Sequence, residues 1–257
     1  MSRLDAAFRR AANVGGQNQG LVIDVAPDIP YDRAAGRRSV LELEPQVRVP
    51  SNAVNHLASL AQTLDLHPAK PRTVAFVASG RGEGTTTCVA NVGRYLAQHH
   101  AKVLMVDANT RWPALHTIAR VNRTRGLLDV VGADADVRTV VQSTSVPTLF
   151  VLSSGGDAQG ACAGPLLLPS VLRERLFSRT TEYDFVLIDC PAIHECEDTA
   201  VTAAACDAVI LIVEGGRTLR EEAQAAKALL TRAHARILGV FMNKRKFYVP
   251  KFLYDRL

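Results

Sequence analysis

The chain has 257 residues, of which 47% are hydrophobic and 21% charged, the composition of an ordinary globular protein. This length suits one α/β domain with an extension. The formal net charge of +5 is compatible with an acidic partner surface but too small to indicate nucleic-acid binding. No apolar run approaches the ~18 residues that cross a bilayer. Residues 1–12 mix arginines with apolar residues, so we expect no secretory signal. The five cysteines predict free thiols in a reducing cytoplasm.

The first fifty residues divide into a short helix and a linker. Apolar residues at helical spacing, opposite a face of arginines, predict an amphipathic helix over residues 1–12. Such a helix either docks on a partner or an anionic membrane, or packs as an ordinary terminal helix. Residues 13–50 combine Gly-Gly, Gln and Asn with four prolines and little periodicity, which predicts a largely disordered linker. Within it, the apolar residues 21–23 are a candidate local contact.

From residue 51 onward, apolar strands alternate with helical patterns, and we predict a domain over residues 51–243 followed by a basic-aromatic tail over residues 244–257. The predicted strands are at residues 74–77, 102–107, 148–152, 185–189, 208–213 and 237–242. The helical patterns are at residues 51–66, 85–97, 127–131, 166–178, 197–206 and 219–233. Continuous apolar strands spaced by helices predict an α/β fold, with a mostly parallel sheet covered by helices on both faces.

A glycine-rich loop joins the first of these strands to its helix. Residues 79–84 read Ser-Gly-Arg-Gly-Glu-Gly, and three threonines then open the helix. Glycines let backbone N–H groups converge on an anion, and the helix start adds unpaired donors and its dipole. A P-loop ends in Gly-Lys-Ser/Thr, whereas this loop ends in Gly84-Thr85-Thr86. The pattern therefore predicts a P-loop fold that lacks the lysine.

Two later strands end in aspartate, at Asp107 and Asp189. Ligands of parallel sheets bind beyond the carboxyl ends of the strands, so the loop and both aspartates should converge on one site. Asp189 is placed to hold Mg²⁺ through water, and the Thr86 hydroxyl to ligate the same ion. The alternative for each aspartate is helix capping at a strand-to-helix turn. Thr85 offers no charge, so Arg81 or Arg111 would have to supply one.

Five segments together resemble the bacterial tyrosine autokinase family of capsule and exopolysaccharide biosynthesis (CpsD/CapB-like), whose superfamily includes the MinD/ParA-like ATPases: GRGEGTTTCVANVGRYLA, VLMVDANTRWPALH, GLLDVV, YDFVLIDCPAIHECEDTA and ILGVFMNKR. The resemblance covers residue 51 to the C-terminus. It implies ATP or ADP with Mg²⁺ as cofactors, held by Gly82, Glu83, Gly84, Thr85, Thr86, Thr87, Arg111 and Asn243. It implies catalytic roles for Asp107 and Asp189, which with Thr86 are also the metal ligands.

The resemblance also implies phosphate-accepting tyrosines in the tail, here Tyr248 and Tyr254, and a membrane polysaccharide co-polymerase (Wzz-like) as partner. Four departures weaken the catalytic pattern. Thr85 replaces the lysine, and Asn109 replaces the second aspartate of the Asp-x-Asp-x-Arg-x-Pro frame. The Glu-x-x-Arg-x-x-Arg helix that assembles subunits appears as the uncharged residues 51–56, so we do not expect that mode of oligomerisation. The tail holds only two tyrosines.

The sequence therefore predicts a kinase-like pseudoenzyme, cytoplasmic and peripheral to the inner membrane, that regulates or scaffolds a polysaccharide co-polymerase. We expect nucleotide binding to be weak or absent. The first alternative is an active tyrosine autokinase or ATPase in which an arginine replaces the lysine. A weaker alternative is a partitioning ATPase of the ParA/MinD type. No nucleic-acid partner is expected.

Overall fold

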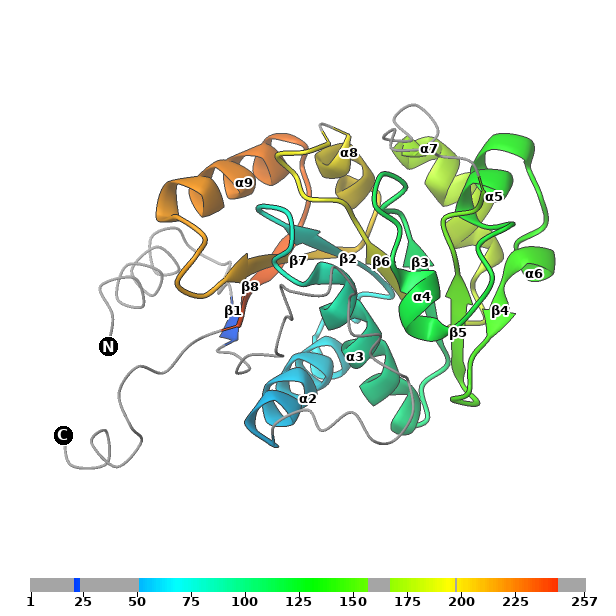
Figure 1. Cartoon of the computed structure of the whole chain (residues 1–257), viewed down its shortest axis with the longest axis horizontal. Helices are drawn as coiled ribbons and strands as arrows, with labels where there is room; N and C mark the ends of the chain where they lie inside the picture. Colours follow the sequence, from blue (N-terminus) through cyan, green and yellow to red (C-terminus); the bar gives the residue numbers. More distant parts are fainter. Residues whose placement is uncertain (1–20, 24–50, 157–166, 197, 245–257) are drawn as a thin grey trace, which may run out of the picture.

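The computed structural model describes residues 21–23, 51–156, 167–196 and 198–244 (Figure 1). The predicted N-terminal helix, most of the predicted linker and the tail tyrosines Tyr248 and Tyr254 lie outside these ranges. None of the helices in the described ranges combines the length and apolar character needed to cross a membrane.

The centre of the protein is an eight-stranded sheet of order β1-β8-β7-β2-β6-β3-β5-β4. All neighbouring strands run parallel except β4 and β5. The strands are β1 (Leu21–Ile23), β2 (Thr73–Ala78), β3 (Val103–Asp107), β4 (Gln142–Ser143), β5 (Leu149–Leu152), β6 (Phe185–Asp189), β7 (Ala208–Glu214) and β8 (Ile237–Asn243). The predicted α/β fold with a mostly parallel sheet is confirmed, and the candidate local contact at residues 21–23 is strand β1, which pairs with β8.

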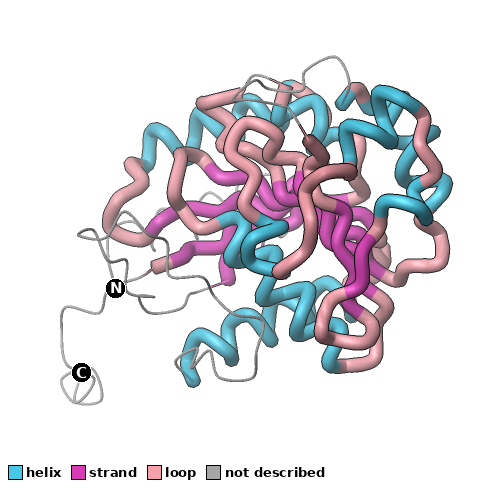
Figure 2. The backbone as a smooth tube through the Cα atoms, turned by 45° about the vertical axis from the view of Figure 1, so that its right-hand side comes forward, coloured by secondary structure: helices cyan, strands magenta, loops and turns pink. Residues whose placement is uncertain are grey.

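Helices cover both faces of the sheet, as the central layer of strands in Figure 2 shows. Helices α2, α3 and α4 pack on one face; α5, α6, α8, α9 and the helical turn η2 pack on the other. Their bounds are α2 (Ser51–Leu66), α3 (Thr85–Gln98), α4 (Leu115–Ala119), α5 (Leu127–Ala133), α6 (Val137–Val140), α7 (Pro169–Val171), η2 (Leu172–Leu176), η3 (Phe177–Arg179), α8 (Thr199–Ala204) and α9 (Arg220–Arg232).

The core explains why the strands are continuous apolar runs. In β2, Ala75 and Val77 join the core under α9, whereas Val74 and Phe76 join the core under α3. Successive side chains of a strand point to opposite faces, so a strand buried on both faces needs apolar residues at every position. At Gly93 in α3, a Cβ atom would lie 2.8 Å from the sulfur of Met105, so glycine permits this close approach of helix and sheet.

The structure corrects two of the sequence-based predictions. The predicted helix over residues 166–178 is divided: α7 begins at Pro169, a residue tolerated in the first turn of a helix, and a π-helical turn and a 3₁₀ turn follow. The prediction of five free thiols is wrong for Cys196, which forms a disulfide, whereas Cys88, Cys190 and Cys206 are free and buried.

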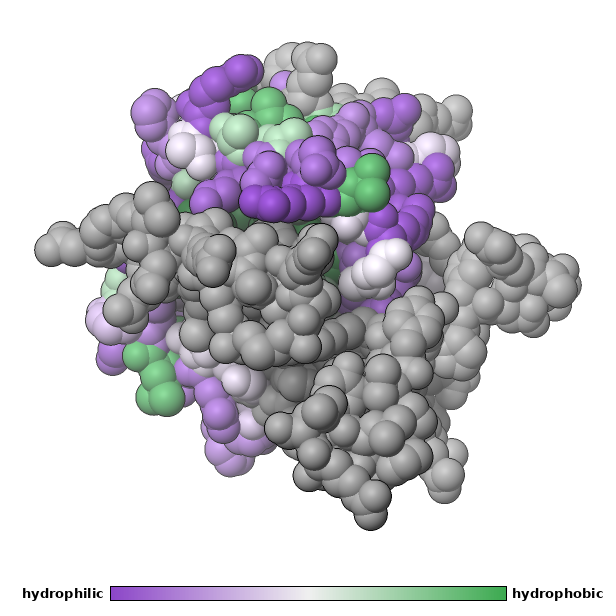
Figure 3. Space-filling model, turned by 90° about the vertical axis from the view of Figure 1, so that its left-hand side faces the viewer, coloured by the Kyte–Doolittle hydropathy of each residue, from purple (hydrophilic) through white to green (hydrophobic). Residues whose placement is uncertain are grey.

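The surface seen from the α9 side is mostly hydrophilic in its described part (Figure 3). Helix α9 exposes charged residues such as Glu221 and Lys227 there and buries Ala223, Ala226 and Leu230. At the edge where the parallel strands end, β8, β7, β2, β6 and β3 lie next to one another. The sheet therefore brings the ends of five strands to one place.

Candidate nucleotide-binding site

The glycine-rich loop leaves the end of β2 and enters α3 at Thr85. Gly82 and Gly84 adopt φ values of +82° and +94°, a region that side-chain-bearing residues rarely occupy. A Cβ atom at Gly84 would also collide with the amide nitrogen of Asn243. The positive φ favours glycine at this position, and a Cβ atom would in addition displace the Asn243 amide from its hydrogen bond to the Glu83 carbonyl.

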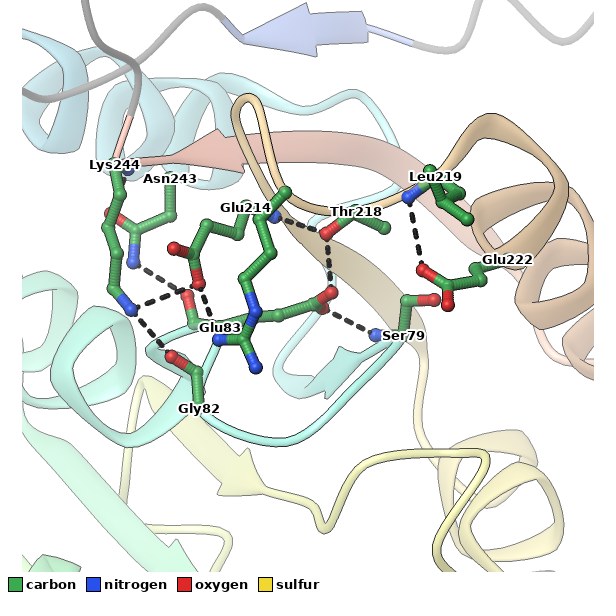
Figure 4. A network of polar contacts seen from close by, with 10 residues as sticks. Ser79, Gly82, Glu83, Glu214, Thr218, Leu219, Glu222, Asn243 and Lys244 are labelled. Carbon is green, nitrogen blue, oxygen red and sulfur yellow. Dashed lines mark hydrogen bonds and ion pairs between the residues drawn. The ribbon is translucent and has the colours of Figure 1, made fainter.

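Glu83 braces the loop from within (Figure 4). Its side chain is only 4% exposed, and its carboxylate accepts hydrogen bonds from the backbone N–H of Ser79 at 2.8 Å and the Thr218 hydroxyl at 2.5 Å. Burial raises the pKa of Glu83, and these hydrogen bonds oppose the rise. Glu83 therefore connects the start of the loop, at Ser79, with Thr218 in the segment between β7 and α9.

The end of β8 holds the same loop from outside. The Asn243 side-chain amide donates to the carbonyl of Glu83 at 2.8 Å, and the Lys244 ammonium donates to the carbonyl of Gly82 at 2.6 Å. Lys244 also pairs with Glu214 at 3.1 Å (Figure 4). Asn243, the last residue of β8, and Lys244, which follows it, therefore hold two consecutive carbonyl groups of the loop.

The two predicted carboxylates lie side by side at the ends of β3 and β6, where Asp107 and Asp189 are register partners and both fully buried. Asp107 accepts hydrogen bonds from the backbone N–H groups of Leu115 and Asn109, at 3.1 and 3.2 Å. Burial raises the pKa of Asp107 to about 7, despite these bonds. Asp107 therefore supports the turn that leads into α4, although the N-cap residue of that helix is Ala114, and it remains beside Asp189.

Asp189 differs from Asp107 because neither of its carboxylate oxygens has a hydrogen-bond partner. Burial, and then the charge of Asp107, raise the pKa of Asp189 well above its usual range. The Thr86 hydroxyl lies close enough to oppose this rise, although without the geometry of a hydrogen bond. A buried carboxylate with two unsatisfied oxygens is costly unless a cation or a proton joins it.

These residues fit a magnesium ion. Asp189 presents unsatisfied oxygens, Asp107 lies next to it, and Thr86 adds a hydroxyl, which are the oxygen ligands that Mg²⁺ prefers. Within the described ranges, no group of three or more His, Cys, Asp or Glu side chains could hold a metal by itself. Mg²⁺ usually keeps several waters and shares its coordination with substrate phosphates, so the protein needs to supply only one or two carboxylates.

The two arginines considered as substitutes for the lysine have other partners. The Arg81 guanidinium lies over the Trp112 ring, 4.1 Å from its centroid. Arg111 donates to the carbonyl of Glu195 at 2.6 Å, and its buried Nε atom has no partner. Thr85 is 9% exposed and opens α3 without a charge. Asn109, which stands where the frame has its second aspartate, accepts from the backbone N–H of Trp112 and so supports a local turn.

The structure places the predicted loop, both aspartates and Asn243 at the same edge of the sheet. Three further residues of this site were missed: Glu214, Thr218 and Lys244. The sequence analysis places Lys244 at the start of the basic tail, although it also stands in the segment ILGVFMNKR that carries the resemblance. All three residues lie at or just after the ends of β7 and β8. Only the strand order shows that these ends are next to the loop that follows β2.

A glycine loop at a helix N-terminus, beside paired carboxylates at the ends of parallel strands, defines the P-loop NTPase class of fold and site. Residues 71–220 match the family model described as AAA domain. The tyrosine-protein kinase YwqD of Bacillus subtilis (strain 168) is 30% identical over 175 residues, covering 68% of this chain and 73% of that relative. The chain therefore belongs to the bacterial tyrosine-protein kinase family of CpsD-like P-loop proteins.

Solved structures agree on the fold. The kinase domain of the Escherichia coli tyrosine kinase ETK superposes with a TM-score of 0.73 at 20% identity, covering 90% of this chain and 91% of that chain. The septum site-determining protein MinD from Pyrococcus horikoshii OT3, complexed with Mg-ADP, gives a TM-score of 0.57 at 24% identity, covering 72% and 76% of the two chains. The expected MinD-like P-loop fold is confirmed.

Proposed function

We propose that this chain is a kinase-like component of exopolysaccharide or capsule biosynthesis that regulates or scaffolds a membrane polysaccharide co-polymerase, with little or no tyrosine kinase activity of its own. Its family membership supports the biological setting. The observation that carries the loss of activity is Thr85, which opens α3 without a charge at the head of a fully formed loop. Removing a preorganised electrostatic stabiliser costs about 10²–10³ in kcat.

The site is proposed to retain a nucleotide pocket of reduced strength. Residues 82–87, Arg111 and Asn243 would hold ATP or ADP, and Thr86, Asp107 and Asp189 would hold Mg²⁺. A bound nucleoside triphosphate would supply the phosphoryl group and much of the negative charge that the loop accommodates. Without the ammonium of a lysine at position 85, the phosphates lose one charge-assisted hydrogen bond, and such a bond contributes about 1.5–3 kcal/mol.

The proposed location is the cytoplasmic side of the inner membrane. The expected basic helix over residues 1–12 and the basic-aromatic tail over residues 244–257 would contact the co-polymerase or anionic lipids, because clustered Lys and Arg residues are attracted to the negative inner leaflet. Tyr248 and Tyr254 would be the phosphate acceptors if any transfer occurred. All of these segments except Lys244 lie outside the described residues.

Calorimetry with Mg-ADP and Mg-ATP, combined with radiolabelled ATP, tests the proposal on the full chain. We expect weak or undetectable binding and no label on Tyr248 or Tyr254. Thr85→Lys is the informative variant, because it restores one charge to a loop that is otherwise in place, and it should tighten Mg-ADP binding by roughly 10- to 100-fold. Micromolar binding together with tyrosine labelling in the unmodified protein would show that the protein is an active kinase.

One observation favours that rival function. The buried Nε of Arg111 has no partner, and a buried unsatisfied donor is costly unless a ligand completes it. In the rival proposal Arg111 contacts a phosphate and replaces the missing lysine. The rival proposal requires a measurable ATP turnover that Arg111→Met and Asp189→Ala both abolish. The control variant Arg232→Met, at an exposed position in the last turn of α9, should leave that turnover intact.

A further inference from the structure

The carbonyl groups of Gly82 and Glu83 are both tied to the end of β8, by Lys244 and Asn243 respectively. In a trans peptide unit the C=O and the following N–H point in opposite directions. The described residues contain no cis peptide bond. Fixing these two carbonyls on the β8 side therefore directs the N–H groups of Glu83 and Gly84 away from β8.

Those two N–H groups lie where the loop enters α3. Gly84 has left-handed backbone angles, and successive backbone N–H groups in turn conformations can form a concavity that binds anions. The N–H groups at the start of α3 follow directly, so the orientation of two peptide planes decides whether the loop and the helix present their donors together.

Lys244 adopts an uncommon backbone conformation where β8 ends. Its φ of +55° is uncommon for a residue with a side chain, and Asn243 supports it by accepting a hydrogen bond from the Lys244 N–H at 3.0 Å. The ammonium is also held by Glu214, whose side chain is only 16% exposed.

From these contacts we propose that Lys244, held by Glu214 and acting together with Asn243, is a positioning residue of the phosphate-binding loop. It acts through the Gly82 carbonyl and not as a substitute cation on the phosphate. This inference rests on the proposed nucleotide site. Lys244 contributes to the form of the loop without a lysine at position 85, because the end of β8 holds two of the loop's carbonyl groups.

The test uses the full chain and the variants Lys244→Met and Lys244→Arg, with Lys227→Met as a matched control. Lys227 is exposed on α9, and its removal changes the net charge equally. Hydrogen–deuterium exchange of peptides covering residues 79–87, measured without nucleotide, reports the loop itself. Titration with the fluorescent nucleotide mant-ADP and Mg²⁺, at two salt concentrations, reports the affinity and its ionic component.

We expect Lys244→Met to speed exchange in the loop several-fold and to weaken mant-ADP binding about tenfold, with the salt dependence unchanged. Lys244→Arg should retain much of both properties because it keeps a charged donor, and Lys227→Met should match the unmodified protein. Loop exchange equal to that of the unmodified protein in Lys244→Met would overturn the proposal. So would a clear loss of salt dependence, since that would indicate direct contact with the phosphates.

The exchange measurement decides the matter even if the unmodified protein binds no mant-ADP. Failure of the proposed function would be seen separately, as tyrosine labelling or as indifference of polysaccharide production to the protein. Neither result depends on the exchange rate of residues 79–87, so the two failures are distinguishable.

Discussion

Replacing Asp189 by asparagine should stabilise the protein in the absence of magnesium. The Asp189 carboxylate is fully buried, has no hydrogen-bond partner and lies beside Asp107. Removing its charge removes both the desolvation penalty and the repulsion between the two carboxylates. Asparagine has nearly the same size, so the surrounding packing is preserved. The charge of Asp189 would then lower the stability of the fold while serving the binding of Mg²⁺.

The magnitude follows from the burial and from the missing partners. A buried group left unsatisfied costs about 1–3 kcal/mol, and more when it is charged. The amide of asparagine would inherit part of this cost, so we expect a net gain of about 1–2 kcal/mol at pH 8. For a domain of this size, that gain raises Tm by about 3–6 °C.

The gain should depend on pH in a defined direction. Burial raises the pKa of Asp189 above that of the unfolded chain, so the folded state is penalised at pH values above that pKa and is relieved as the pH falls through it. Its neighbour Asp107 has a pKa of about 7, and the pair should therefore take up a proton near neutrality. The advantage of Asp189→Asn should be largest at pH 8 and should shrink below pH ~6.

Thermal unfolding of the full chain between pH 5.5 and 8.5, with and without Mg²⁺, measures all three effects. Asp65→Asn is the control, because Asp65 is exposed on α2. Magnesium should stabilise the unmodified protein and the control but not Asp189→Asn. A lower Tm for Asp189→Asn at pH 8, or a difference between the proteins that is independent of pH, would refute the reasoning about the buried carboxylate pair.

Two further variants test the loop. Gly84→Ala should lower the free energy of unfolding by about 2–3 kcal/mol in urea, because its Cβ would collide with the Asn243 amide and its φ is positive. Gly216→Ala also has positive φ but open space, so it should cost only about 1 kcal/mol, and equal losses would contradict the steric argument. Arg81→Ala should change the emission of Trp112, the single tryptophan, because the guanidinium lies over its ring. An unchanged spectrum would mean that the two side chains do not stack in solution.

The sheet was predictable because its strands obey one strong physical rule. A parallel strand covered on both faces must be apolar at each position, and the segments that became β2, β6 and β7 are continuous apolar runs. The shortest elements were missed for the corresponding reason. Strand β4 has two residues and α6 has four, too few to establish a period of two or of 3.6.

The loop and the aspartates were predictable for a different reason, because each follows a strand and parallel strands end at the same edge. Lys244 and Thr218 were not, because their roles depend on which strands are neighbours. Only the order β8-β7-β2 brings the ends of β7 and β8 to the loop, and contacts such as Thr218 to Glu83 join residues 135 positions apart. A sequence pattern records separation along the chain, so side-chain contacts of this range leave no local signal.

In this site, the form of the phosphate-binding loop and the positive charge that stabilises phosphoryl transfer have separate origins. The form of the loop comes from the positive φ values of Gly82 and Gly84, from the Glu83 carboxylate and from the end of β8, none of which involves the side chain at position 85. The charge that would stabilise a transferring phosphoryl group comes from the lysine, which Thr85 replaces. Under the proposed function, the chain keeps the loop formed while it lacks this electrostatic contribution to catalysis. For this reason Thr85→Lys is expected to act as a gain of affinity on a preformed loop, and it should leave the exchange of residues 79–87 in the nucleotide-free protein nearly unchanged.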